Sequence, residues 1–292
     1  MALIPAYYLD AVVSIGQLDK DGYKSLATSF LVGLLTGQKT LEGHNTYSVY
    51  LATNRHVFAE KKEIHLRFNL SAGGTKTYCL PLLDEKNQPK WIAHPNGTID
   101  LAALQVNYGN MVQAEKIKCN FIQEENMAFL DVIKREGITQ GDSIFALGFP
   151  LQMAGIEQNY VIARGGIIAR LDDEIVKKES SFLIDSNIFP GNSGGPVILK
   201  PEVTAIEGTP AVNKAYLLGV ISGYIAYQDV AVSLQTKQPR VIFNENSGLA
   251  KVVPMDFIKE MLQKKTEDKP DTPKEVEVKT NESASAQPAA QC

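Results

Sequence analysis

The segment Pro190-Gly191-Asn192-Ser193-Gly194-Gly195-Pro196 is the most informative stretch of this chain. A serine flanked by glycines can occupy a sharp, exposed turn that a Cβ would obstruct. In such a turn the backbone N–H groups of Gly191 and Ser193 can converge on one point beside the hydroxyl, which is the arrangement of an oxyanion hole. Serine is a weak nucleophile by itself and requires an adjacent base, which in turn requires an orienting group. The segment therefore predicts a histidine and a carboxylate at strand ends or in loops elsewhere.

Two earlier segments supply those residues. His56 lies in Thr53-Asn54-Arg55-His56-Val57, directly after an expected strand, and Asp100 precedes another strand in Gly97-Thr98-Ile99-Asp100-Leu101. Taken alone, His56 would be an ordinary histidine and Asp100 a turn residue beside Asn96-Gly97. Their order and their separations of 44 and 93 residues make them candidate partners of Ser193. The other histidines, His44, His65 and His94, are expected to be structural.

With these motifs in view, the chain resembles the trypsin-like serine peptidases of the chymotrypsin fold, and most nearly the bacterial HtrA (DegP-like) type. The order His, Asp, Ser is the one that chymotrypsin-type barrels use. Further matches lie between residues 11 and 262, and they are Ala27 to Val32, His94-Pro95, Gly148-Phe149-Pro150, Asp185 and Gly219 to Ser222. Relatives of the HtrA type usually carry a PDZ domain, whereas none is expected here.

The resemblance implies a role for each matching residue. His56 acts first as general base and then as general acid, Asp100 holds its tautomer, and Ser193 attacks the carbonyl carbon. The amides of Gly191 and Ser193 bind the oxyanion. The implied activity is that of a serine endopeptidase, which cleaves extended or unfolded polypeptide through an acyl-enzyme without metal or organic cofactor.

The resemblance also implies which residues bind substrate. The strand Ile221-Ser222-Gly223-Tyr224 is expected to pair with the substrate backbone. Asn187 stands six residues before Ser193, where trypsin itself has a carboxylate, so a preference for Lys or Arg is not expected. Asn192 replaces the aspartate that in digestive relatives pairs with a newly released amino terminus. Activation by cleavage of a zymogen is therefore not expected.

The expected fold is all-β, with two six-stranded antiparallel barrels and a C-terminal helix. Ile64, Leu66 and Phe68 alternate with polar residues, as in a half-buried strand. The other expected strands are Tyr47 to Thr53, Ser143 to Leu147, Val161 to Arg170, Phe182 to Asp185, Val197 to Leu199 and Leu217 to Ser222. Helices are expected at Asn126 to Arg135 and Met255 to Lys264. The expected division is 1–118 for the first barrel, 119–264 for the second barrel and its helix, and 265–292 for a disordered tail.

The composition of the chain limits the classes of binding partner and the cellular location that are expected. The net charge of −4 argues against nucleic-acid binding, and no apolar run approaches a membrane span. The opening residues do not resemble a secretory signal, and the three cysteines, Cys79, Cys119 and Cys292, cannot form a disulfide framework. A cytoplasmic location is therefore expected. Cys79 is expected to be a small core residue.

Two other functions and the state of assembly stay open at this stage. A peptidase fold could capture extended peptides without turnover, and an esterase could use the same triad, although an esterase does not explain the residue order. The segments Leu34 to Thr46 and Lys200 to Ala215 exceed the common core. Together with Tyr224 to Asn244 they could form a lid, a dimer surface or a specificity loop. Polypeptide is the expected partner, and a homo-oligomer is compatible with the sequence.

Overall fold

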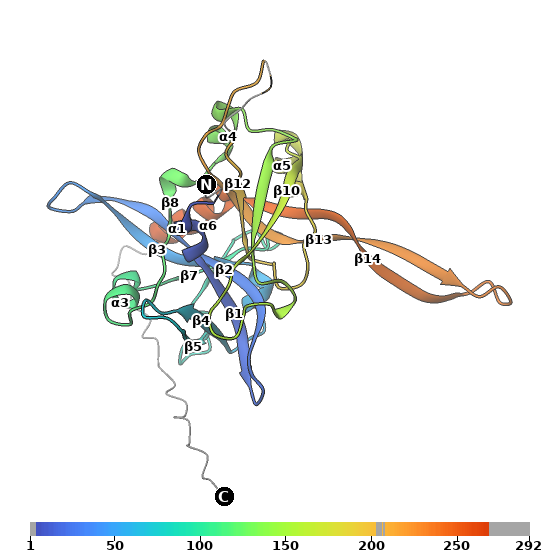
Figure 1. Cartoon of the computed structure of the whole chain (residues 1–292), viewed down its shortest axis with the longest axis horizontal. Coiled ribbons are helices and arrows are strands. Elements are labelled where there is room, and N and C mark those ends of the chain that lie inside the picture. The colour runs from blue at the N-terminus through green and yellow to red at the C-terminus, as the bar shows by residue number, and fades with distance from the viewer. Residues whose placement is uncertain (1–3, 203–205, 207, 269–292) are drawn as a thin grey trace, which may run out of the picture.

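The first half of the chain forms an eight-stranded sheet (Figure 1). The computed structural model describes residues 4–202, 206 and 208–268. The strand order is β5-β4-β1-β2-β3-β7-β6, and β8 pairs in parallel with β2. The strands are β1 (Val12–Asp19), β2 (Gly22–Lys39), β3 (Asn45–Thr53), β4 (Glu63–Asn69), β5 (Thr75–Pro81), β6 (Ile92–Ala93), β7 (Ala102–Gln105) and β8 (Ile122–Gln123). Six of these strands have four residues or more, and the other two, β6 and β8, have two residues each.

Alternation along the strands builds the core of this sheet. Ile64, Leu66 and Phe68 of β4 pack with Tyr78 and Leu80 of β5 in one buried cluster. The intervening side chains of both strands therefore point to the opposite face of the sheet.

The second half is a closed six-stranded barrel with the order β10-β11-β14-β13-β12-β9. Its strands are β9 (Ser143–Gly148), β10 (Ile162–Arg170), β11 (Phe182–Asp185), β12 (Pro196–Leu199), β13 (Leu217–Val232) and β14 (Pro239–Pro254). Each pairing inside the barrel is antiparallel. The expected all-β class with a C-terminal helix is confirmed.

Helix α6 (Met255–Asp268) closes the molecule against both halves. It begins directly after Pro254 and buries Ile258, Met261 and Leu262. The same buried cluster contains Phe30 and Ile99 from the first half, and also Leu147, Ile198 and Leu217 from the second. One core is thus shared across the boundary between the two β structures.

Strands β13 and β14 continue beyond the barrel as a two-stranded arm (Figure 1). The pairing runs outward from Ala226↔Asn246 to Val232↔Pro239. We call the segment Tyr224 to Asn246 the arm. It contains the stretch Tyr224 to Asn244, which the sequence analysis named as part of a lid, a dimer surface or a specificity loop.

The remaining helices differ in part from the expectation. The helix expected at Asn126 to Arg135 is a 3₁₀ turn, η1 (Glu124–Asn126), followed by α4 (Leu130–Glu136). Helix α4 begins at Leu130, whose N–H donates to the carboxylate of Asp256 in α6, so a contact distant in the sequence holds the start of this helix. The other short helices are α1 (Ala6–Asp10), α2 (Arg55–Phe58), α3 (Tyr108–Gln113), α5 (Asp173–Glu179) and η2 (Pro150–Gln152).

The expected division of the chain stays a prediction. Strand β8, which lies beyond residue 118, pairs with β2 of the first sheet. Helix α6 extends through Asp268, four residues into the segment expected to be disordered, and 269–292 with Cys292 lie outside the described residues.

Candidate active site

His56 and Asp100 meet at the edge of the first sheet. Helix α2 is a single turn anchored by the buried side chains of Val57 and Phe58, which leaves His56 on its exposed side. His56 Nδ1 lies 2.7 Å from Asp100 Oδ2, and the His56 backbone N–H donates to Asp100 Oδ1 at 3.0 Å. The buried Asn54 side chain donates to the Asp100 carbonyl at 2.9 Å and fixes the loop that carries Asp100. Both carboxylate oxygens are thus engaged by His56.

These hydrogen bonds determine the charge of Asp100. Partial burial acts to raise the pKa of the Asp100 carboxyl, but the hydrogen bonds from the His56 ring and backbone outweigh it and lower that pKa. Ser222 of β13 adds a weaker contact, because its Oγ donates to Asp100 Oδ2 at 3.4 Å. The carboxylate therefore stays ionised and can orient an imidazole and stabilise its protonated form.

The serine turn leaves two amides without an acceptor. The Pro190 carbonyl accepts from the Leu151 N–H at 2.9 Å, so the N–H of the trans Pro190–Gly191 peptide points the opposite way. The Asn192 carbonyl likewise accepts from the Gly195 N–H at 2.9 Å, which turns the Ser193 N–H away from it. Among the described residues, neither the Gly191 nor the Ser193 amide donates to any other group.

Thr28 of β2, in the first sheet, is hydrogen-bonded to this turn. Its Oγ1 donates to the Gly191 carbonyl at 2.6 Å and accepts from the Phe149 N–H at 3.0 Å, and its N–H donates to the Ser193 carbonyl at 3.0 Å. Thr28 is fully buried. The sequence matched Thr28 only as part of a strand, and its role in the site depends on a contact 163 residues distant in the chain.

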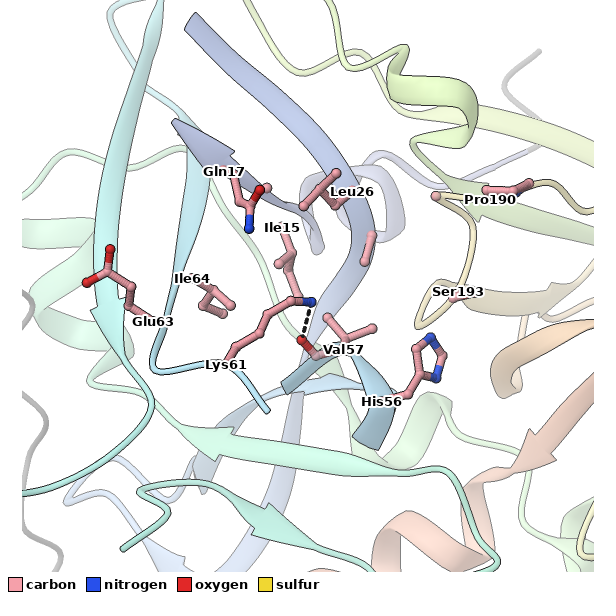
Figure 2. A pocket seen from close by; sticks show the side chains of 13 residues that line it. Ile15, Gln17, Leu26, His56, Val57, Lys61, Glu63, Ile64, Pro190 and Ser193 are labelled. Carbon is pink, nitrogen blue, oxygen red and sulfur yellow. Dashed lines mark hydrogen bonds between the residues drawn. The ribbon is translucent and has the colours of Figure 1, made fainter. Parts of the chain in front are cut away.

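His56, Gly191 and Ser193 line one cavity (Figure 2). Figure 2 shows the His56 ring beside the loop that carries Ser193. Within the described residues His56 and Ser193 are not hydrogen-bonded to each other, and such contacts commonly tighten only when substrate binds. Lys61 and Glu63 line part of the cavity. The rest of its wall is mainly apolar and is formed by Ile15, Leu26, Ala27, Val57 and Ile64.

The residues expected to bind substrate lie elsewhere around the serine turn. Ile221 is buried and bonds through its backbone to Gly194 and Gly195, while Ser222 contacts Asp100. Asn187, Gly223 and Tyr224 do not line the cavity. Asn187 is exposed, and a Cβ at Gly248 would lie 3.9 Å from its Oδ1.

Asn246, at the root of the arm, contacts the segment before the serine. Its side chain donates to the Ile188 carbonyl at 2.6 Å and accepts from the Gly248 N–H at 2.9 Å. Sequence reasoning missed this residue, because only the fold brings the arm root to that segment.

A family model described as the trypsin-like peptidase domain matches residues 32–203. The matched range covers more than half of the chain and contains His56, Asp100 and Ser193. The chain belongs to the trypsin-like peptidase family. In this trypsin-like peptidase domain the matched range begins within β2 and ends after β12, so β13, β14 and α6 lie beyond it.

Solved structures give matches of low sequence identity. The MamO protease domain from Magnetospirillum magneticum, in its apo form, is 14% identical with a TM-score of 0.44, over 87% of this chain and 96% of that one. The Rv3671c protease, in an inactive form, is 15% identical with a TM-score of 0.41, over 89% and 90% of the two chains. A serine-to-alanine mutant of Rv3671c from M. tuberculosis H37Rv, also inactive, is 14% identical with a TM-score of 0.44, over 91% of each chain. No curated protein matches.

None of the helices in the described part of this peptidase-family chain combines the length and apolarity needed to span a bilayer.

Proposed function

We propose that this protein is a serine endopeptidase that cleaves extended polypeptide through Ser193, His56 and Asp100. The observation that carries the proposal is the set of contacts around Ser193. His56 is held by Asp100 at 2.7 Å and shares a cavity with Ser193, beside two amides that have no acceptor.

The residues divide the chemistry among themselves. The neutral His56 ring takes the proton of the Ser193 hydroxyl as its oxygen bonds to the substrate carbonyl carbon. Negative charge then develops on the carbonyl oxygen, and the Gly191 and Ser193 amides can stabilise this oxyanion by donating hydrogen bonds to it. The protonated ring returns the proton to the leaving amine, and a water molecule repeats the sequence on the acyl-enzyme. Asp100 stabilises the imidazolium in both halves of the reaction.

The size of the cavity favours a polymer as substrate. Its volume is about 210 Å³, below the roughly 300–1,000 Å³ of sites that enclose a small molecule. Such a cavity accommodates one or two side chains of a chain that passes through the site. Its apolar wall favours apolar residues there.

A fluorophosphonate probe tests the proposal. The purified, uncut chain is expected to be labelled and to cleave casein, because Asn192 cannot form the ion pair on which activation by cleavage depends. Ser193→Ala is expected to abolish labelling and cleavage, while Ser71→Ala, at an exposed serine, is expected to retain both. Wild-type protein that binds casein but is never labelled would instead identify a binding module without turnover.

A further inference from the structure

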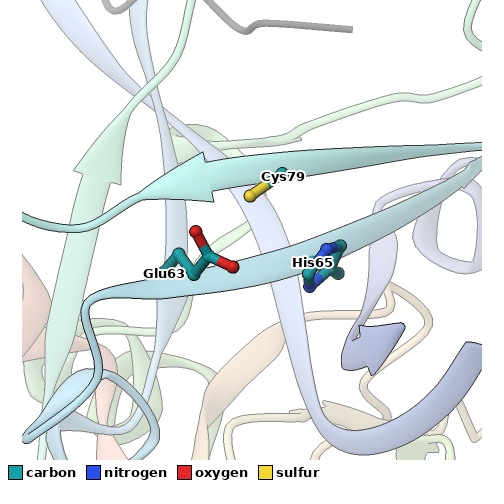
Figure 3. A group of neighbouring side chains, drawn as sticks. All are labelled: Glu63, His65 and Cys79. Atoms are coloured by element: carbon teal, nitrogen blue, oxygen red, sulfur yellow. The ribbon is translucent and has the colours of Figure 1, made fainter. Parts of the chain in front are cut away.

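Three side chains with metal-binding atoms gather on the outer face of the first sheet (Figure 3). Glu63 and His65 are two residues apart on β4, so they share a face. Cys79 on β5 lies directly opposite His65 in the antiparallel register. The neighbouring residues Ile64, Leu66, Tyr78 and Leu80 fill the core. Cys79 is therefore not the core residue that the sequence suggested, because it points away from the core and is partly exposed.

The three donor atoms are close enough to share one ion. The nearest ligand atoms of the three residues all lie within 4.8 Å of one another. A carboxylate oxygen, an imidazole nitrogen and a sulfur form a donor set that zinc accepts, with water as the fourth ligand of a tetrahedron.

We propose that Glu63, His65 and Cys79 form a zinc site. Binding releases the thiol proton to solvent and forms bonds from Zn²⁺ to the sulfur, one imidazole nitrogen and one carboxylate oxygen. Glu63 also lines the cavity shared by His56 and Ser193, so the ion would bind at the border of that cavity.

Cobalt substitution tests the site without reference to peptidase activity. Titration of the full chain with Co²⁺ is expected to give one equivalent of binding and a sulfur-to-cobalt charge-transfer band, both displaced by Zn²⁺. Cys79→Ser is expected to abolish the band, and Glu63→Gln or His65→Asn to weaken binding by about tenfold or more. The matched control is Cys119→Ser/Cys292→Ser, which keeps Cys79 as the sole thiol and retains the band.

Three outcomes would overturn the zinc site. They are the absence of stoichiometric binding to wild-type protein, a band that survives in Cys79→Ser, and binding to His65→Asn as tight as to wild type. Fluorophosphonate labelling of Ser193, measured on the same samples, reports on the proposed function separately.

The arm carries a second, independent inference. Eight of its large apolar side chains are between 39% and 86% exposed, and they are Tyr224, Tyr227, Val230, Val232, Leu234, Val241, Ile242 and Phe243. Val230 pairs with Ile242 on one face, while Tyr227 and Phe243 lie on the other. A two-stranded ribbon is marginally stable in water by itself, and stability normally comes with a third strand or with packing against another element.

A second copy of the chain suits the arm best. An aromatic side chain can bury about 150–250 Å², and Tyr224, Tyr227 and Phe243 are between 39% and 58% exposed, so the arm offers a partner apolar area in addition to its backbone edge. The charged residues of the arm, Asp229, Lys237, Arg240 and Glu245, sum to zero, so two arms do not repel each other. The outer edge of a strand can also pair with its own copy in antiparallel fashion around a two-fold axis.

We infer that two copies of this chain associate through their arms. The edge pairing completes a four-stranded sheet and brings apolar side chains of the two arms into contact across the new strand pair. The inference does not depend on catalysis, because it concerns association alone.

Mass measurement in solution tests the association. Light scattering or sedimentation at micromolar concentration is expected to give the mass of a dimer for wild type and of a monomer for Val230→Thr/Ile242→Thr/Phe243→Thr, in which threonine preserves strand propensity. The control Leu41→Thr, at a fully exposed residue of another hairpin, is expected to stay dimeric. A monomeric wild type, or a triple variant that still dimerises, would refute the inference. A monomer in which the triple change weakens cleavage of long peptides but not of short ones would assign the arm to substrate instead.

Discussion

Gly191 adopts a backbone conformation that only glycine can take at this position, because neighbouring atoms leave no room for a Cβ. Its φ is +100°, and a Cβ would lie 2.4 Å from the Phe149 carbonyl oxygen. Gly191→Ala must therefore displace the turn and with it an amide of the proposed oxyanion hole. We expect kcat to fall by about 10²–10³-fold, the size that follows loss of one oxyanion donor. Gly22→Ala is the matched control, because Gly22 has a φ of +108° in open space and lies at the β1–β2 turn, so activity should be unchanged.

Thr28 is expected to act as a positioning residue through Gly191. Thr28→Val preserves the shape of the side chain but leaves the Gly191 carbonyl and the Phe149 N–H without their partner. The unfolding free energy should fall by about 1–3 kcal/mol. Since the freed carbonyl can turn toward the hole, kcat should fall while KM changes little. Thr28→Ser, which keeps the hydroxyl, should recover most of kcat, and equal losses in both variants would contradict the role.

Asp100 is expected to act through the tautomer of His56. Asp100→Asn keeps a side chain of the same size, but its amide group favours the wrong tautomer of the ring. We expect kcat to fall by about 10⁴-fold in casein or peptide cleavage, with the fold unchanged. Asp185→Asn, at an exposed aspartate, is the control and should remain fully active. A small effect of Asp100→Asn would indicate that His56 is not the base.

Asp256 at the start of α6 joins this helix to α4. Its carboxylate accepts the Leu130 N–H, and burial raises the pKa of this carboxyl above the ordinary 3.8. The unfolded chain loses this proton at lower pH than the folded chain does, so the contribution of Asp256 to stability is lost as the pH rises from 3.8 through the folded-state pKa. Asp256→Asn should therefore gain stability relative to wild type over that range. Urea unfolding across the acid range measures the difference, with Glu85→Gln as control, and a constant difference would contradict the assignment.

Sequence patterns predicted the strands and helices that are buried on one face better than the arm, which has apolar residues on both faces. The strand Phe182 to Asp185 matches β11 in full, and the start of α6 follows Pro254 as expected, because burial on one face leaves a clear period in the sequence. The arm has apolar residues on both faces, so no single period marks it, and the strand expected to end at Ser222 continues to Val232. Cys79 shows the reverse case, because it was expected in the core, whereas it alternates with the buried Tyr78 and Leu80 and so points to the opposite face of the sheet.

The candidate site depends on contacts between segments far apart in the chain, which no local sequence pattern contains. The motif around Ser193 and the spacing of His56 and Asp100 identified the candidate triad from sequence. The contacts of Thr28 with the serine turn and of Asn246 with Ile188 join segments far apart in the chain. The Thr28 contacts depend on how the two β structures pack together, and the Asn246 contact depends on how the second barrel closes, so a local sequence pattern predicts neither.

That packing predicts that the two halves unfold together. Ile258 of α6 is fully buried in the core that draws residues from both halves. Ile258→Ala should therefore lower the unfolding free energy by about 2–5 kcal/mol.

Trp91, the single tryptophan, packs on Phe58 in the first half, so its fluorescence reports on that half alone. If the core is cooperative, the Trp91 transition and the circular-dichroism transition should coincide in wild type and shift equally in Ile258→Ala. Leu41→Ala, at an exposed site, should shift neither. A Trp91 transition that stays in place while the circular-dichroism transition moves would instead mean that the halves unfold independently.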